Sequence, residues 1–305
     1  MYLEHYLSEL DYPHIPNFLI KYLKTPSLLR LKKVSYFCGM DYASKDIYNF
    51  SECISRFDHS ITVALLTYKL TKDKIQTLSG LFHDIATPCF SHVIDYMNED
   101  YENQESTEEY TSYILKNDKY LKECLKEDNI NIDDIINFKK YPIVDNDRPK
   151  LCADRLDGVI LTGICWTKNI TKDDITKIVK DITIVKNEEN TDEIGFKSLA
   201  IAKKVLDVSK TIDIYCHSKE DNYMMLLLAK ITKLSINKQY ISYEDLYKYN
   251  EEELFTILES KNNQELTNYL NEFKHIKKEA IPDMDFPKIK IRNLYPLVDG
   301  RRIKE

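Results

Sequence analysis

Glycine is scarce in this chain, at six of 305 residues. Neither GxxxxGK[ST] nor GxGxxG occurs, which excludes the glycine-rich loops that cradle phosphate groups with backbone N–H groups. No apolar run approaches the length of about 18 residues that marks a membrane span, and the N-terminal segment MYLEHYLSEL is too acidic and polar for a secretory signal. We therefore expect a cytoplasmic protein without a membrane partner. Any phosphate that it binds must be held by side chains and metal.

Paired cysteines and an excess of basic charge are also missing. The seven cysteines are scattered and never form CxxC, so a disulfide framework and a structural zinc site are not expected. The formal net charge of −7 argues against a broadly basic nucleic-acid surface. Lys288–Arg292 alternates basic and apolar residues, but alternating basic residues on an edge strand more often deter aggregation than bind a ligand. We expect no nucleic-acid partner.

The dominant pattern is helical, with apolar residues at three- and four-residue spacing. Thr87-Pro88 should end one of these helices, and Pro26 should break another. The predicted helices cover 16–37, 57–70, 73–86, one or two within 104–128, 150–165, 197–216, 220–235, 243–247 and 251–274.

Strands are a minority. The segment 180–196, KDITIVKNEENTDEIGF, predicts a short strand, a turn and a second strand, and the alternation at 288–292 predicts a half-buried strand. No alternating strand–helix rhythm appears, so a doubly wound sheet is not expected. We predict a mainly α fold, divided into a helical core at 1–165 and a smaller helical, partly β region at 166–305.

Three of the seven histidines lie beside or near an acid: Asp58-His59, His83-Asp84 and His92 with Asp95. His59 lies near the start of one predicted helix and His83 near the end of the next, so antiparallel packing would bring them together. Asp154 starts a later helix, where it could equally be an N-cap. Two imidazoles and two carboxylates suit iron, manganese, zinc or magnesium, but each piece alone is a weak signal.

Four ordered motifs resemble the HD-domain phosphohydrolases, most closely the dNTP triphosphohydrolase branch. They are Arg56-Phe57-Asp58-His59-Ser60, Leu81-Phe82-His83-Asp84-Ile85, Phe90-Ser91-His92 and Ala153-Asp154-Arg155-Leu156-Asp157. The resemblance implies an HD-domain core in which His59, His83, Asp84 and Asp154 hold a divalent metal. It also implies hydrolysis of a phosphate ester by metal-activated water, with Asp84 in the catalytic set.

The same resemblance suggests further site residues. His92 would act as general acid or position water, with Asp95 tuning its basicity, although the pair could simply cap a helix. Arg56 and Thr87 would contact substrate, although Arg56 could instead pair with Asp95 or Asp58. Tyr215 and His217 resemble a substrate-side pair, and could equally be a core aromatic residue and a surface histidine.

The departures from the family pattern concentrate on substrate recognition. Thr87 replaces a histidine of the catalytic pocket, and Gln104-Glu105 replaces a His-Glu pair. Tyr36 stands where a glutamine reads the deoxyribose, Gly158 and Thr162 stand where sugar-facing residues belong, and Asp207 stands near an arginine for the distal phosphates. Because a carboxylate at Asp207 would repel a triphosphate, we predict hydrolysis of a nucleotide or a similar small phosphorylated metabolite without assigning dNTPs.

Two alternatives remain. These losses could mark a catalytically weak HD-fold module that senses a nucleotide without turnover. A di-iron HD oxygenase would need further ligands, and Thr87 and Gln104 stand at two candidate positions. We also expect a homo-oligomer, since members of this family often assemble through C-terminal elements.

Overall fold

The computed structural model describes residues 1–104 and 110–304. Within these ranges the fold is mainly α with one small sheet, as the sequence predicts. The described helices include none that is both long and apolar enough to cross a membrane. Gln104 is described, whereas Glu105, its partner in the Gln104-Glu105 pair, lies outside the described residues.

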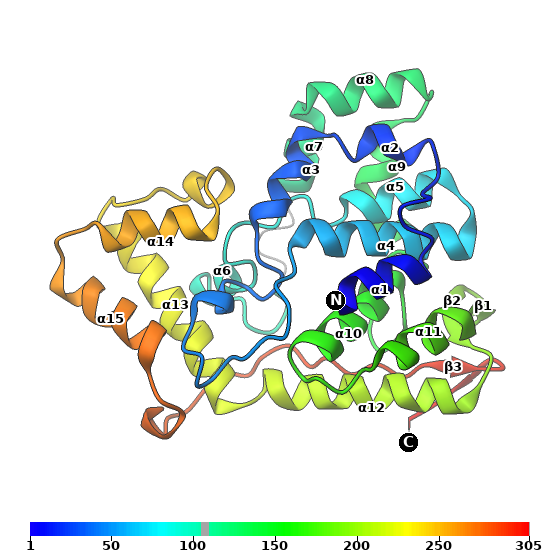
Figure 1. Cartoon of the computed structure of the whole chain (residues 1–305). Coiled ribbons are helices and arrows are strands. Elements are labelled where there is room, and N and C mark those ends of the chain that lie inside the picture. The colour runs from blue at the N-terminus through cyan, green and yellow to red at the C-terminus, as the bar shows by residue number, and fades with distance from the viewer. Residues whose placement is uncertain (105–109, 305) are drawn as a thin grey trace.

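Helices α4 (Arg56–Thr71) and α5 (Lys74–Phe82) form an antiparallel pair beside the N-terminal helices (Figure 1). α4 begins with a capping box, in which the Ser55 side chain accepts from the backbone N–H of Asp58 and the Asp58 side chain accepts from that of Ser55. Lys72, in the left-handed conformation at φ 53°, ends α4, and the Asp73 side chain caps α5. This short turn places the start of α4 beside the end of α5.

Helix α5 ends earlier than the sequence predicts. The prediction continued it to residue 86, but its last residue is Phe82. The Nδ1 atom of His83 donates to the backbone carbonyl of Gly80 at 2.7 Å, and that carbonyl would otherwise accept from the amide of residue 84. The side chain therefore replaces a helical hydrogen bond, and His83 and Asp84 lie in the turn that follows the helix.

Helix α10 (Ala153–Cys165) packs against α4 and against α12 (Leu199–Cys216). Gly163 permits close packing at its end, because an added Cβ there would lie 2.6 Å from the Ile170 side chain. Figure 1 shows α12 running beneath α10, and the C-terminal segment returning alongside α12 towards the sheet. The backbone amide of Arg292, within that segment, donates to Asp213 on α12.

The remaining helices are distributed along the whole described chain. Their bounds are α1 Tyr2–Glu9, α2 Leu19–Tyr22, α3 Pro26–Arg30, α6 Val93–Met97, α7 Tyr110–Asn117, α8 Lys119–Glu127, α9 Ile132–Ile136, α11 Lys172–Asp181, α13 Lys219–Asn237, α14 Glu251–Glu259 and α15 Gln264–His275. Short 3₁₀ turns occur at Leu31–Lys33, Met40–Tyr42, Phe138–Lys140, Glu244–Tyr247 and Lys278–Ala280.

The sheet has the order β1-β2-β3-β4. The hairpin of β1 (Ile182–Lys186) and β2 (Asp192–Phe196) confirms the strand–turn–strand prediction. β3 (Leu297–Val298) adds parallel to β2, and β4 (Arg301–Arg302) adds antiparallel to β3. The prediction of a strand at 288–292 is wrong, because this segment belongs to no helix or sheet. Among the described residues, its only backbone–backbone hydrogen bond to a distant segment joins Lys290 to Tyr101.

Several predicted helices differ in extent. Pro26 begins α3 instead of breaking a helix, as its fixed φ suits the first helical position. Residues 34–37 are not helical: Val34 is extended, Ser35 forms a bridge with Ser55, and residues 36–37 lie in a turn. The segment 251–274 forms two helices, because the Asn263 side chain caps a new start. No helix is predicted over the residues of α11. The division of the chain into two regions at residue 165 stays a prediction. One continuous hydrophobic core contains residues from both regions.

Glu251 is a buried carboxyl group with a predictable effect on stability. It is 2% exposed and accepts hydrogen bonds from the backbone amides of Ser35 and Phe90. Burial, together with the nearby Asp41, raises its pKa from 4.5 to about 7. The folded state therefore retains a proton that the unfolded chain has lost between pH 4.5 and 7. The stability contributed by this group is full below 4.5 and is lost as pH rises through 7.

We predict that Glu251→Gln reduces the fall in unfolding free energy between pH 5 and 8 by on the order of 1–3 kcal/mol, because one pKa unit corresponds to about 1.4 kcal/mol. Urea unfolding at several pH values measures this. The exposed neighbour Glu252 provides the matched control, Glu252→Gln. Equal pH slopes for wild type and Glu251→Gln would contradict the assignment.

Candidate metal centre

Two imidazole nitrogens and two carboxylates converge where α4, the end of α5 and α10 meet. We call His59, His83, Asp84 and Asp154 the His–Asp cluster. His59 Nε2 lies 3.1 Å from Asp154 Oδ1, and His83 Nε2 lies 3.5 Å from the same oxygen. His59, His83 and Asp154 each offer a ligand atom within 4.8 Å of the others. Asp84 borders this group, with its oxygens 3.6 Å from His83 Nε2 and 3.7 Å from His59 Nε2.

Each histidine is oriented through its other ring nitrogen. His59 Nδ1 bonds the Asp157 carboxylate at 2.7 Å, and His83 Nδ1 donates to the Gly80 carbonyl at 2.7 Å. Metal-binding histidines have this arrangement, in which a carboxylate or carbonyl fixes the tautomer and leaves Nε2 as the ligand atom. Asp157 is 0% exposed, and its second oxygen accepts from the Tyr6 hydroxyl at 2.8 Å.

The cluster also contains a buried nitrogen that a bound cation would satisfy. His83 Nε2 is buried and has no hydrogen-bond partner within the described ranges, and an unsatisfied buried nitrogen is costly. A divalent ion coordinated by two imidazoles and one or two carboxylates would satisfy it. The described residues therefore include a His/Asp group able to hold a divalent metal, and the donor set does not distinguish iron, manganese, zinc and magnesium.

The electrostatics agree with this fit. Burial acts to lower the pKa of His59, but hydrogen bonds to Asp154 and Asp157 outweigh burial and raise it to about 10. Burial acts to raise the pKa of Asp84, but the charges of His83, Arg56 and His59 lower it to about 2. The carboxylates thus create a local field that attracts positive charge.

A second group of possible ligands is less suitable. Asp145, Cys152 and Asp154 also lie within reach of one another. However, Arg155 pairs with Asp145 at 2.8 Å. Burial raises the pKa of the Cys152 thiol to about 12, so its thiolate form is disfavoured.

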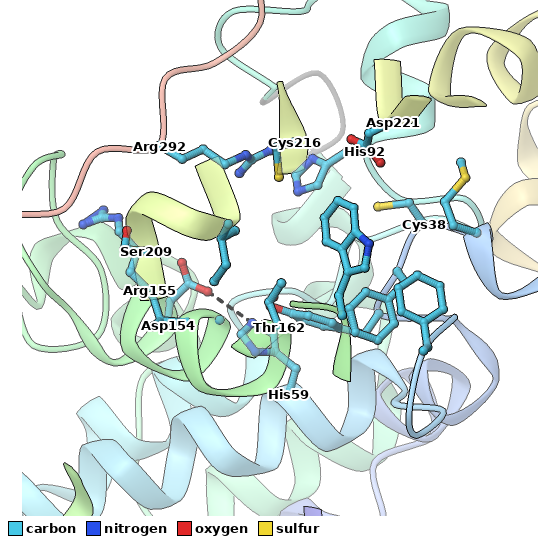
Figure 2. Close-up of a pocket in the computed structure, with 18 of the residues that line it drawn as sticks. Cys38, His59, His92, Asp154, Arg155, Thr162, Ser209, Cys216, Asp221 and Arg292 are labelled. Carbon is cyan, nitrogen blue, oxygen red and sulfur yellow. Dashed lines mark ion pairs between the residues drawn. The ribbon is translucent and has the colours of Figure 1, made fainter. Parts of the chain in front are cut away.

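Two neighbouring cavities adjoin the cluster, with volumes of about 230 Å³ and about 630 Å³. Residues that line both are Arg56, His92, Arg148, Asp154, Arg155 and Arg292. In Figure 2, His59, Asp154 and Thr162 lie on one side of the first cavity, and Arg292, Cys216, His92 and Asp221 lie on the opposite side.

The first cavity also has an aromatic wall, formed by Tyr36, Phe37, Tyr48, Phe50 and Trp166. Phe37 and Phe50 stack with ring centroids 4.1 Å apart. Tyr36 lies between Arg56 and His59, at 5.1 Å and 5.2 Å from its ring centroid. An added Cβ at Gly158 would lie 3.2 Å from the Tyr36 hydroxyl, so the absence of a side chain at 158 leaves room for this ring.

The structure places the other predicted residues at different distances from the cluster. His92 Nδ1 bonds Asp95 at 2.9 Å at the start of α6, and His92 lines the cavities. Arg56 pairs with Asp84 at 2.8 Å, and not with Asp58, which caps α4. Thr87 lines a smaller cavity together with Arg56, His83, Asp84 and His92.

Tyr215 and His217 are not brought to the cluster. Both are exposed at the end of α12, where Tyr215 packs edge-on against Trp166 and His217 bonds the Asp213 carbonyl. Neither belongs to the residues lining the described cavities, whereas Cys216 between them does. Residues adjacent along a helix point about 100° apart, which separates them from the cavity-facing position.

The predicted effect of Asp207 is wrong. Its side chain is exposed on the outer face of α12, and the cavity is lined instead by Ser209, Ile212 and Cys216 of that helix. Asp207 therefore supplies no repulsion against a triphosphate inside the cavity. The face that a residue occupies depends on its exact position along the helix, because a shift of one residue turns a side chain by about 100°.

Three contributors to the site had no predicted role. Asp157 could have been found, because it lies three residues after Asp154 and so shares a helix face with it. Arg148 comes from the loop before α10, and Arg292 comes from the C-terminal segment. No local sequence pattern marks either residue as part of a site. Residue 292 comes close to the HD motifs only in the folded chain.

Comparison with known proteins agrees with this geometry. Residues 56–159 match the family model for the HD domain. This segment is therefore similar to an HD domain. All four members of the His–Asp cluster lie inside the matched segment, whereas Arg292 and Trp166 of the cavity wall lie outside it.

Two relatives extend the comparison. Uncharacterized protein YdhJ of Bacillus subtilis is 25% identical over 262 residues, which cover 83% of this chain and 75% of that protein. Metal-dependent phosphohydrolase cns2 of Cordyceps militaris is 25% identical over 129 residues, 42% of this chain and 36% of that protein. The chain thus spans most of the first relative and only about a third of the second.

Asp157→Asn should weaken metal binding while leaving all four members of the cluster in place. An amide can present its NH₂ to His59 Nδ1, which would move the imidazole proton to Nε2 and remove a ligand lone pair. We predict a loss of about 10- to 100-fold in affinity for Mn²⁺ or Zn²⁺, measured by competition with a chelator. Glu251→Gln, at another buried carboxyl group, should retain wild-type affinity. Equal affinities in all three proteins would contradict the role of Asp157.

Proposed function

We propose that the protein is a metal-dependent phosphohydrolase that hydrolyses a phosphate ester of a nucleotide or a similar small metabolite. The observation that carries the proposal is the convergence of His59 Nε2, His83 Nε2 and an Asp154 oxygen beside a cavity that arginines line. The HD domain and the name of the cns2 relative support the same reaction class.

His59, His83, Asp84 and Asp154 would hold the cation. When bound, a divalent cation in such a site lowers the pKa of water and polarises a phosphoryl oxygen. Arg56 fixes the Asp84 carboxylate through the 2.8 Å pair and keeps it ionised. Asp157 and Gly80 keep both imidazoles in the tautomer whose Nε2 can bind metal.

His92 is the residue that we propose for proton transfer. Burial lowers its pKa despite the hydrogen bond to Asp95, so the neutral ring predominates at pH 7. With Nδ1–H donating to Asp95, Nε2 carries the lone pair. In this form His92 accepts a proton from water or orients it. Its action as a general acid would require prior protonation.

The aromatic wall favours a planar, weakly polar group in the substrate. Phe37, Phe50 and Trp166 offer ring faces and edges, and aromatic contacts of this kind suit a nucleobase. The resemblance to the dNTP triphosphohydrolase branch stays a prediction, as does assembly into a homo-oligomer. We do not extend it to a dNTP substrate, because Tyr36 occupies the space beside Gly158.

A sensor that binds without turnover is the second candidate. The Gln104 side chain, standing at one departure from the family pattern, accepts a hydrogen bond from Arg292. Gln104 therefore holds the Arg292 side chain in place instead of supplying an imidazole. A sensor would show ligand-induced thermal stabilisation with no product under any metal.

A panel of nucleotides and generic phosphate esters, assayed with manganese, iron, magnesium or zinc, tests the enzyme. We predict metal-dependent phosphate release that falls by more than about 100-fold in His83→Ala, since loss of a ligand should exceed the 10- to 100-fold typical of an outer partner. The exposed His275 provides the control, His275→Ala, with wild-type rates expected. Absence of product with every metal and ester would contradict the proposal.

A further inference from the structure

Three arginines from separate parts of the chain surround the junction of the two cavities. Arg56 begins α4, Arg148 precedes α10, and Arg292 belongs to the C-terminal segment outside the HD domain. We call these three residues the arginine wall. All three line both cavities, together with His92 and Asp154.

Each arginine retains an unused hydrogen-bond donor. Arg56 Nε, Arg148 Nη1 and Arg292 Nε are buried and have no acceptor within the described part of the chain. Arg56 still pairs with Asp84 and Arg292 with Gln104. Arg148 makes no hydrogen bond or ion pair with any described residue. Buried guanidinium groups are normally paired, so this arrangement is costly in the free protein.

The wall is also short of negative charge. Burial, together with the charges of Arg292 and Arg155, lowers the pKa of Arg148 to about 10. Like-charged guanidinium groups repel one another at close range. An anion placed between them would relieve both the repulsion and the unsatisfied donors. Asp84 pairs with Arg56 and Asp145 pairs with Arg155, so neither carboxylate pairs with Arg148 or Arg292.

We propose that Arg148 and Arg292, with Arg56, clamp the terminal phosphoryl group of the substrate against the His–Asp cluster, and that the substrate is therefore a compound ending in a phosphate monoester. This inference rests on the proposed function and names its substrate class. A terminal phosphoryl group presents three non-bridging oxygens and close to two negative charges, which suit several guanidinium groups. A diester presents only two such oxygens and one charge. Arg292 thereby makes the C-terminal segment part of the substrate site.

Inorganic phosphate is the probe for the clamp. Its affinity for the full-length protein in Mg²⁺ buffer, measured by calorimetry, should fall about 10- to 100-fold in Arg148→Gln and in Arg292→Gln, the range typical of a lost hydrogen bond to a charged group. The exposed Arg301 supplies the matched control, Arg301→Gln, with unchanged affinity. Dimethyl phosphate, a diester, should bind at least about tenfold more weakly than phosphate, because it has lost one charge. Unchanged phosphate affinity in both variants would overturn the clamp, and equal binding of dimethyl phosphate would overturn the monoester class.

A stability measurement separates binding from a structural role. Without phosphate, Arg148→Gln should have a Tm equal to or higher than wild type, because it removes a partly buried charge that has no ion-pair partner among the described residues. Added phosphate should then raise the Tm of wild type more than that of the variant. A lower Tm in Arg148→Gln without phosphate would contradict an unpartnered guanidinium. Arg148→Lys keeps the charge but loses the fork, and should give an intermediate phosphate affinity.

The clamp and the hydrolase can fail separately. Arginine-dependent phosphate binding without hydrolysis of any ester would retain the clamp and refute the enzyme. Hydrolysis whose KM does not change in Arg148→Gln or Arg292→Gln would retain the enzyme and refute the clamp.

Discussion

The bond between His59 and Asp157 is the interaction on which the site depends. Asp157 is a carboxyl group with no exposed surface, at the centre of contacts among α1, α4 and α10. Burying a carboxylate is unfavourable unless it is hydrogen-bonded, and here the Tyr6 hydroxyl and His59 Nδ1 satisfy it from two sides. The core therefore fixes the imidazole, and the fixed imidazole determines which nitrogen faces Asp154. Packing and ligand geometry are consequences of the same bond.

In the rest of the site, carboxylates and guanidinium groups are concentrated in different regions. Carboxylates surround His59 and His83 on one side of the cavity, and guanidinium groups without sufficient acceptors line the junction with the second cavity. A cation suits the first region and an anion suits the second. In the function that we propose, a metal ion occupies the first region and a phosphoryl group the second, and the ring of the substrate lies against the aromatic wall.

The sequence predicts the elements that carry local signals. The α4 helix, the β1–β2 hairpin and the meeting of His59 with His83 follow from apolar spacing, turn residues and antiparallel packing. The early end of α5 did not follow, because it depends on a side chain that replaces a backbone donor. Asp207 points away from the cavity because of the rotation of α12 about its own axis. The sequence pattern does not specify that rotation. Arg292 reaches the site through a return of the chain, and no local pattern encodes such a contact.

Metal content is the most direct measure of the central claim. Elemental analysis of the purified protein, after incubation with each candidate metal and removal of excess ion, should give one divalent ion per chain in wild type. The same treatment of a His59→Ala, His83→Ala double variant that remains folded should give close to none. Stoichiometric metal in that double variant, or none in wild type with any of the four ions, would contradict the account.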